Sequence, residues 1–159
     1  MIGTINLKRL ALSIGISIGT GLLAAVLTGG GMSTYMTFIK PPLSPPTLVF
    51  PIVWTILYIL MGISAYLILE ADAPEEKKEK ALSIYGFQLL FNFMWSIVFF
   101  NFSNYLLAFI ILVILWFLII AMIVNFKEIN EIAGWLQIPY LVWVTFAGYL
   151  NLAIYLLNR

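Results

Sequence analysis

The sequence predicts an all-α integral membrane protein, a bundle of five transmembrane helices in one domain that covers residues 1–159. The chain is 63% hydrophobic and only 9% charged, whereas a soluble domain is about half apolar and a quarter charged. Several apolar stretches are each long enough to cross about 30 Å of hydrocarbon at a rise of about 1.5 Å per residue. They lie at approximately residues 10–28, 47–69, 81–100, 105–124 and 132–157.

The charged residues all lie outside these spans, and their distribution predicts the orientation of the chain. With an odd number of spans, the two termini face opposite sides of the membrane. Cationic residues on the N-terminal side are Lys8, Arg9, Lys77, Lys78, Lys80 and Lys127, against Lys40 and Arg159 on the other side. By the positive-inside rule we expect a cytoplasmic N-terminus and an external C-terminus, in what we take to be a bacterial cell membrane.

The composition also excludes several classes of function. The chain contains no cysteine and no histidine, which rules out disulfides, thiol nucleophiles, histidine haem ligands and the usual zinc sites. We therefore expect no metal and no required cofactor. A net charge of +1 without a basic stripe predicts no nucleic-acid partner. The absence of ionisable residues inside the spans argues against ion-coupled transport and acid–base catalysis, but leaves passage of an apolar ligand open.

A proline-rich loop and the helix after it suggest the rim and wall of a pocket. The loop reads KPPLSPP, and its prolines lack an amide donor and exclude helical structure. Thr47 is expected to cap the next helix, with Pro51 in its first turns. Phe50, Trp54 and Tyr58 then fall on one face of that helix.

Small residues in the first span allow two interpretations. Ser17, Gly21, Ala25 and Gly29 recur every four positions, and Gly15 and Gly19 form a second set. Such spacing lets helix backbones approach closely in lipid. It predicts either tight packing within one chain or a seam between two copies.

The third span carries amides at membrane depth. Gln88 and Asn92 lie four residues apart, and Trp95 and Phe99 continue the same stripe. Unbonded amides are costly in hydrocarbon, so we expect them to face the interior of the bundle. They either bond to neighbouring helices or contact a ligand.

The fifth span contains a proline and an aromatic residue beside small ones. Pro139 frees a carbonyl one turn earlier and predicts a kink. Trp143 and Ala147 lie on one face with Leu150 or Asn151. A large aromatic ring next to a gap is compatible with ordinary packing or with a flat ligand.

Three separated motifs resemble the TspO/MBR family, whose members are tryptophan-rich sensory proteins and translocator proteins. They are KPPLSPP…FPIVW…LYILMG, QLLFNFMWSIVFF and IPYLVWVTFAGYLN, and the resemblance runs from about Tyr35 to Asn158. It implies a five-helix bundle, often a homodimer, with a pocket that opens towards the first loop. It further implies small hydrophobic ligands, namely porphyrins and haem-related tetrapyrroles, sterols, and synthetic isoquinoline carboxamides and benzodiazepines.

The resemblance places Trp54, Asn92 and Trp95 in that pocket, along with Trp143, Ala147 and Leu150. Residues Tyr35–Pro46 would form its lid. Lys40 on the lid either pairs with a propionate carboxylate or remains an exposed charge. The full set of ligand-binding candidates is Tyr35, Lys40, Phe50, Trp54, Tyr58, Gln88, Asn92, Trp95, Phe99, Trp143, Phe146, Ala147, Leu150 and Asn151.

Two departures from the family pattern bear on activity. Thr34 and Leu43 stand where the family usually has tryptophan. Some bacterial members are associated with light- and oxygen-dependent breakdown of protoporphyrin, for which Trp143 would be the catalytic candidate here. The missing loop tryptophans favour binding over breakdown. Facilitated transport and a ligand-free structural role are the remaining alternatives.

The end of the chain also fits a permissive sterol-recognition pattern. That pattern is made by Leu150, Tyr155 and Arg159. An apolar helix that ends in arginine often meets it by chance, so it carries little weight.

Overall fold

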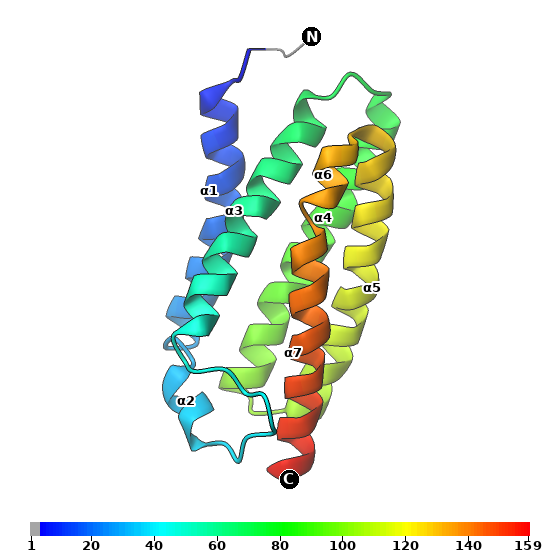
Figure 1. Ribbon diagram of the computed structural model, residues 1–159. Coiled ribbons are helices and arrows are strands. Elements are labelled where there is room, and N and C mark those ends of the chain that lie inside the picture. Colours follow the sequence, from blue (N-terminus) through cyan, green and yellow to red (C-terminus); the bar gives the residue numbers. More distant parts are fainter. Residues whose placement is uncertain (1–3) are drawn as a thin grey trace.

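The computed structural model describes residues 4–159, and every regular element within them is helical (Figure 1). Five helical segments are long and apolar enough to span a membrane, which confirms the predicted fold class. The fifth segment consists of two helices, α6 and α7. The elements are α1 (Leu7–Leu27), α2 (Met32–Thr37), α3 (Val49–Glu70), α4 (Glu75–Ser96), the π-helical turn η1 (Ile97–Asn101), α5 (Tyr105–Ile129), α6 (Glu131–Trp135) and α7 (Ile138–Leu157).

The helices run past the apolar stretches that predicted them. The third apolar stretch was predicted from residue 81, but α4 already begins in the charged run at Glu75, with two acidic residues in its first turn. Acidic side chains favour a helix N-terminus, because they complement its dipole. At the other extension, α5 continues to Ile129, and the side chain of Asn130 then caps α6. Hydropathy detects only the part of a helix that lies in hydrocarbon.

The predicted cap of α3 was wrong. Thr47 was expected to cap this helix, but the N-cap residue is Leu48 and no side chain caps the end. The first turn is started by backbone bonds instead, from the Val49 amide to the Pro46 carbonyl at 3.0 Å and from Phe50 to Thr47 at 3.3 Å. Pro51 lies within that first turn as predicted.

Pro139 starts a helix and does not kink one. α6 ends at Trp135, and α7 begins at Ile138 with the proline in its first two positions. The missing N–H of a proline costs little in a first turn, where amides have no helical partner. The fifth span is therefore broken at residues 136–137, which corrects the predicted kink.

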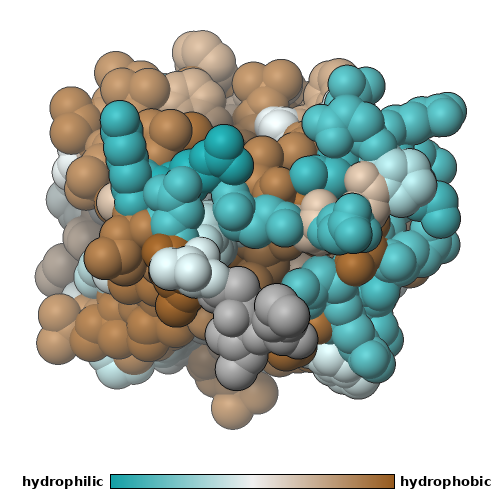
Figure 2. All heavy atoms as spheres, turned by 90° about the horizontal axis from the view of Figure 1, so that it is seen from above, coloured by the Kyte–Doolittle hydropathy of each residue, from teal (hydrophilic) through white to brown (hydrophobic). Residues whose placement is uncertain are grey.

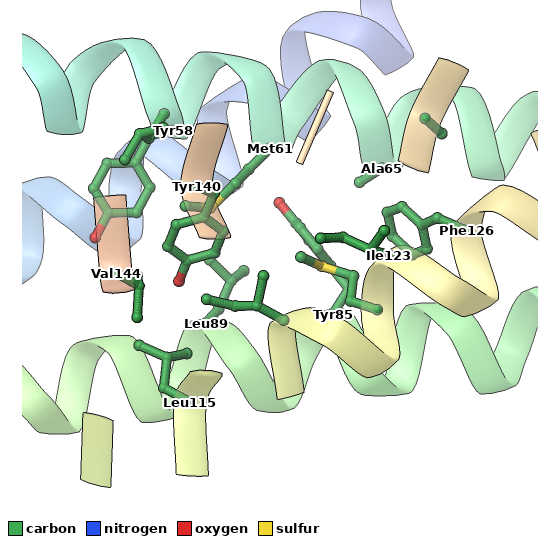
Figure 3. Close-up of a cluster of buried hydrophobic side chains, with 14 of the residues drawn as sticks. Tyr58, Met61, Ala65, Tyr85, Leu89, Leu115, Ile123, Phe126, Tyr140 and Val144 are labelled. Atoms are coloured by element: carbon green, nitrogen blue, oxygen red, sulfur yellow. The ribbon is translucent and has the colours of Figure 1, made fainter. Parts of the chain in front are cut away.

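The main core lies where α3, α4, α5 and α7 meet (Figure 3). Met61 of α3, Leu115 of α5 and Tyr140 of α7 are all fully buried there. Leu89 of α4 points into the same cluster. These four helices form the body of the bundle.

Helix α1 packs at the edge of this body, against α3. The hydroxyl of Ser13 donates to the Gly62 carbonyl at 2.7 Å, and that of Ser17 to the Tyr58 carbonyl at 2.6 Å. A Cβ on Gly62 would lie 2.5 Å from the Ile14 backbone, so the helices touch at this point. Gly15 and Gly19 have open space around their Cβ positions. One set of small residues thus serves packing within the chain, while the other faces away.

The two ends of the bundle differ in charge. The start of α1 and the C-terminus lie at opposite ends, and the C-terminus is at the same end as α2 (Figure 1). Hydrophilic side chains gather over the N-terminal end (Figure 2). Arg9 pairs there with Glu70 at 2.8 Å, and Lys78 donates to the Leu69 carbonyl at 2.8 Å.

Candidate functional site

A cavity of about 340 Å³ lies between α1, α3, α4 and α7, in the half of the bundle next to α2. This volume falls within the range of small-molecule sites. None of the residues that line it is charged. The lining comprises Gly21, Ala24, Ala25, Thr28, Gly30, Met32, Tyr35, Phe50, Pro51, Trp54, Tyr58, Asn92, Trp95, Ser96, Phe99, Phe100, Ala147, Leu150, Asn151 and Ile154.

Aromatic rings form the largest surfaces of the cavity. The Trp54 ring lies 6.4 Å from the Trp95 ring, with an angle of 33° between their planes. The Trp54 ring is also 5.7 Å from that of Tyr58, and Trp95 is 5.5 Å from Phe99. The side chains come from α3, α4 and η1, where helical spacing directs them to one interior. A π-helical turn such as η1 is common at functional sites.

Amides and hydroxyls form a connected network at the inner end of the cavity. The Tyr58 hydroxyl donates to Asn92 Oδ1 at 3.1 Å, and Asn92 Nδ2 donates to the Tyr140 hydroxyl at 2.7 Å. Tyr140 in turn donates to Gln88 Oε1 at 2.7 Å. Gln88 of α4 is therefore bonded to a neighbouring helix, which is one of the two predicted alternatives. Asn92 bonds to neighbouring helices and also reaches the cavity.

A second amide, Asn151, links three helices on the opposite wall. Trp95 Nε1 donates to Asn151 Oδ1 at 2.9 Å, and Asn151 Nδ2 donates to the Tyr105 carbonyl at 2.9 Å. These bonds fix the plane of the Trp95 indole. The orientation of the principal aromatic wall is thus set by polar contacts behind it.

The predicted lid, residues Tyr35–Pro46, contributes Tyr35 to the lining of the cavity. Tyr35 is buried, and its ring lies 4.8 Å from that of Phe50. Its hydroxyl donates to the Pro45 carbonyl at 2.9 Å. Burial raises the pKa of the Tyr35 hydroxyl, so this donor keeps its proton at neutral pH. Phe38 packs edge-on against Phe99 at 5.7 Å.

The structure brings ten of the fourteen predicted site residues to the cavity surface. These are Tyr35, Phe50, Trp54, Tyr58, Asn92, Trp95, Phe99, Ala147, Leu150 and Asn151.

The other four candidates lie elsewhere. Gln88 is one helical turn deeper, in the polar network. Trp143 packs edge-on behind Phe50, at 5.9 Å, and Phe146 packs against Trp143 at 5.6 Å. Lys40 is exposed, with its Nζ 5.0 Å from the centre of the Tyr35 ring.

The wall contributed by α1 was missed by the sequence analysis. Gly21, Ala24 and Ala25 carry no distinctive chemistry, and their spacing was interpreted only as packing. A Cβ on Gly21 would clash with the Tyr58 ring, so glycine is needed there for the ring to sit beside the cavity. The small-residue pattern was the available signal. Pro51, Phe100 and Ile154 were also not among the predicted site residues.

The residues of the sterol pattern do not share one environment. Leu150 lines the cavity and is buried. Tyr155 is half-buried and Arg159 is exposed. Within residues 4–159 there is also no group of three or more acidic, cysteine or histidine side chains that could hold a metal ion.

These features define a class of small polytopic membrane proteins, in which a five-helix bundle encloses an uncharged, aromatic cavity beneath a proline-rich lid. The model of the TspO/MBR family matches residues 13–157. The chain therefore belongs to the TspO/MBR family, and it is an integral membrane protein.

Proteins of similar sequence occur in bacteria and animals. The chain is 35% identical to "Tryptophan-rich protein TspO" of Chlorobaculum tepidum over 96% of its length and 98% of that protein. It is 33% identical to "Protein CrtK" of Rhodobacter capsulatus, over 87% of the chain and 85% of that protein. It is 31% identical to "Translocator protein" of Bos taurus, over 85% and 80% respectively.

Proposed function

We propose that the cavity binds flat, hydrophobic ligands, tetrapyrroles of the porphyrin class above all, and that the protein acts as their sensor, scavenger or carrier. The observation that carries this proposal is the uncharged space beside Trp54 and Trp95, whose rings are tilted by only 33°. Tilted aromatic faces suit a planar ligand, since offset-stacked rings attract each other. The name of the relative from Bos taurus, "Translocator protein", supports a carrier role.

The cavity offers a planar ligand few but well-placed polar contacts. Asn92 reaches the space from the inner end and Ser96 from the side. Amide and hydroxyl groups in such positions orient a ligand without the cost of burying a charge. The carboxylates of a porphyrin would then point towards the lid, where Lys40 is the nearest candidate partner from the sequence analysis. In this structure its ammonium group rests over Tyr35.

Orientation and assembly form part of the same proposal. Lys8 and Arg9 lie at the end of the bundle that also carries residues 75–80, and Lys40 lies at the other end with the C-terminus (Figure 1). The positive-inside rule then places the N-terminus in the cytoplasm and the lid outside. The open face of α1 at Gly15 and Gly19 is compatible with the homodimer that the family resemblance implies.

The first test is a titration of the detergent-purified protein with protoporphyrin IX in the dark, with tryptophan fluorescence as the readout. Saturable quenching is expected. Ala147→Phe fills the cavity and should weaken binding about tenfold or more. Gly148→Ala is the matched control, because its new methyl group faces Leu112 of α5 at an ordinary 3.7 Å. Equal affinities of the two variants would count against this cavity as the site.

A second pair of variants tests the wall behind the lining. Trp143 supports Phe50 and lies 6.5 Å from Trp54, whereas Trp116 donates to Thr145 outside the cavity, at 2.8 Å. Trp143→Ala should therefore weaken porphyrin binding more than Trp116→Ala. Porphyrin absorbance is the suitable readout, since both changes remove a fluorophore.

The alternative function is light-dependent breakdown of protoporphyrin. Trp143, its candidate residue, is separated from the cavity surface by the Phe50 and Trp54 rings. Illumination of the saturated sample distinguishes the two functions. If bound porphyrin bleaches no faster than free porphyrin in detergent, the protein binds porphyrin without degrading it. Faster bleaching that is lost in Trp143→Phe would identify an enzyme.

Facilitated transport of tetrapyrroles or sterols is a further alternative. The lining of the cavity has no carboxyl, amino or guanidinium group that could couple movement to protons or ions. Proteoliposomes loaded with porphyrin would show transport as release that exceeds the release from protein-free vesicles.

A further inference from the structure

The lid is fastened to α7 by the side-chain amide of Asn158. Asn158 Oδ1 accepts a hydrogen bond from the Ile39 amide at 2.9 Å, and Asn158 Nδ2 donates to the Ile39 carbonyl at 2.9 Å. One side chain therefore pairs with both backbone groups of one lid residue, much as a neighbouring strand would. We name this pair of bonds the clasp.

The clasp connects the lid to a wall of the cavity. Asn158 follows the last turn of α7, and its Nδ2 also donates to the Ile154 carbonyl at 2.9 Å. Ile154 lines the cavity. A second contact lies further along the lid, where the Tyr149 hydroxyl donates to the Pro42 carbonyl at 2.7 Å. Both hydrogen-bonded attachments of the lid are thus made by side chains of α7 and of its C-cap residue.

Backbone hydrogen bonds do little else to hold the lid in this position, although the Tyr35 and Phe38 rings pack against the bundle. Prolines at 41, 42, 45 and 46 have no N–H to donate. In the part of the chain that the structure describes, Ile39 has the only backbone amide among residues 39–46 that is hydrogen-bonded to protein. That single donor is held by Asn158.

The tip of the lid has a strained backbone. Leu43 has a φ of +69° and is 82% exposed. Left-handed backbone is unfavourable for a branched side chain, and no packing of this leucine compensates for it. The hydrogen bonds to α7 therefore hold a segment whose tip is strained.

We propose that Asn158 is a positioning residue that holds the lid over the cavity and sets the rate at which solutes enter and leave it. Loss of the clasp frees the Ile39 backbone to bond with water and leaves Tyr149 as the remaining attachment to α7. The identity of the solute rests on the proposed function, but the movement of the lid does not.

The test of lid opening needs no ligand. The chain has no cysteine, so Ala147→Cys introduces a single thiol, in a buried position on the cavity wall. A charged, water-soluble maleimide reaches that thiol when the lid opens. Addition of Asn158→Ala should raise the labelling rate about tenfold, since two hydrogen bonds to the lid are lost.

Asn101→Ala is the matched control. Asn101 is also an asparagine with a side-chain bond to backbone, to the Leu27 carbonyl at 3.0 Å, and it does not contact the lid. Its removal loses a side-chain bond to backbone elsewhere in the bundle and should leave the labelling rate unchanged. Equal labelling rates in the two variants would overturn the proposal.

Stopped-flow measurements with protoporphyrin IX add the ligand. Asn158→Ala should raise the association and dissociation rates together and change the dissociation constant less than either rate. A merely structural role would lower thermal stability without this paired change. If labelling accelerates but no variant binds porphyrin, the role of the clasp is supported and the proposed ligand is wrong. If porphyrin binds and neither rate changes, the clasp has no role in access.

Discussion

Asn92 and Tyr140 are joined by a 2.7 Å hydrogen bond in the centre of the bundle, where both side chains are almost completely buried. Tyr140 passes the connection on to Gln88, and Asn92 receives it from Tyr58 at the edge of the cavity. The polar end of the cavity is therefore held by α3, α4 and α7 together.

Tyr140→Phe should destabilise the protein by about 1–2 kcal/mol, because Asn92 Nδ2 and Gln88 Oε1 each lose a partner in a buried place. The midpoint of thermal unfolding in detergent measures the effect. Tyr155→Phe is the control, since the Tyr155 hydroxyl makes no hydrogen bond to protein within residues 4–159. A network that is dispensable would leave both variants at the wild-type midpoint.

Gly62→Ala should separate α1 from α3. The new methyl group would lie 2.5 Å from the Ile14 backbone, which cannot move aside as a side chain can. We expect a loss of about 1–3 kcal/mol in the free energy of unfolding. Gly15→Ala, with open space at its Cβ, should be neutral or slightly stabilising. Similar losses in both variants would show that helix propensity, and not contact, governs this pair.

Gln137→Met is expected to stabilise the protein. Gln137 is fully buried at the break between α6 and α7, and neither atom of its amide has a hydrogen-bond partner among residues 4–159. Replacement by an apolar side chain of similar shape removes a desolvation cost of about 1–3 kcal/mol. Gln88→Met is the opposite case, since it deprives Tyr140 of an acceptor and should destabilise. A loss of stability in Gln137→Met would indicate an internal water bound by that amide.

Leu43→Asn should relax the lid. Asparagine tolerates the left-handed conformation better than leucine, and the exposed leucine gives up no packing. We expect a gain of about 0.5–1 kcal/mol, part of the usual cost of that conformation. The effect should appear as slower amide hydrogen exchange in the lid. Met36→Asn, an exposed residue of helix α2, should show no such slowing.

The spans could be predicted because each apolar stretch exceeds the thickness of the membrane. Their ends could not, because α4 begins in the charged run at Glu75 and α5 continues to Ile129, beyond what hydropathy detects. The broken fifth span shows a similar limit. Pro139 in the sequence is compatible either with a kink or with the start of a new helix. In the structure residues 136–137 form a turn, and a new helix starts at Ile138.

Residues that line the cavity could be predicted where a helix carries an aromatic or polar stripe. Trp54, Asn92 and Trp95 were all placed correctly at the cavity surface. Gln88 and Trp143 lie on similar stripes, but neither lines the cavity, because Gln88 bonds to Tyr140 and Trp143 packs against Phe50. The sequence pattern of a single helix does not predict such contacts with other helices. The α1 wall was missed, since small side chains look the same whether they touch a helix or an empty space.

The uncharged lining of the cavity has an electrical consequence. A fixed charge inside the membrane experiences the transmembrane voltage, at about 2.3 kcal/mol per elementary charge per 100 mV. The cavity wall contributes none. Occupancy by a neutral ligand should therefore be the same in energised and de-energised membranes, so that only a ligand's own carboxylates could make the protein respond to the energy state of the cell.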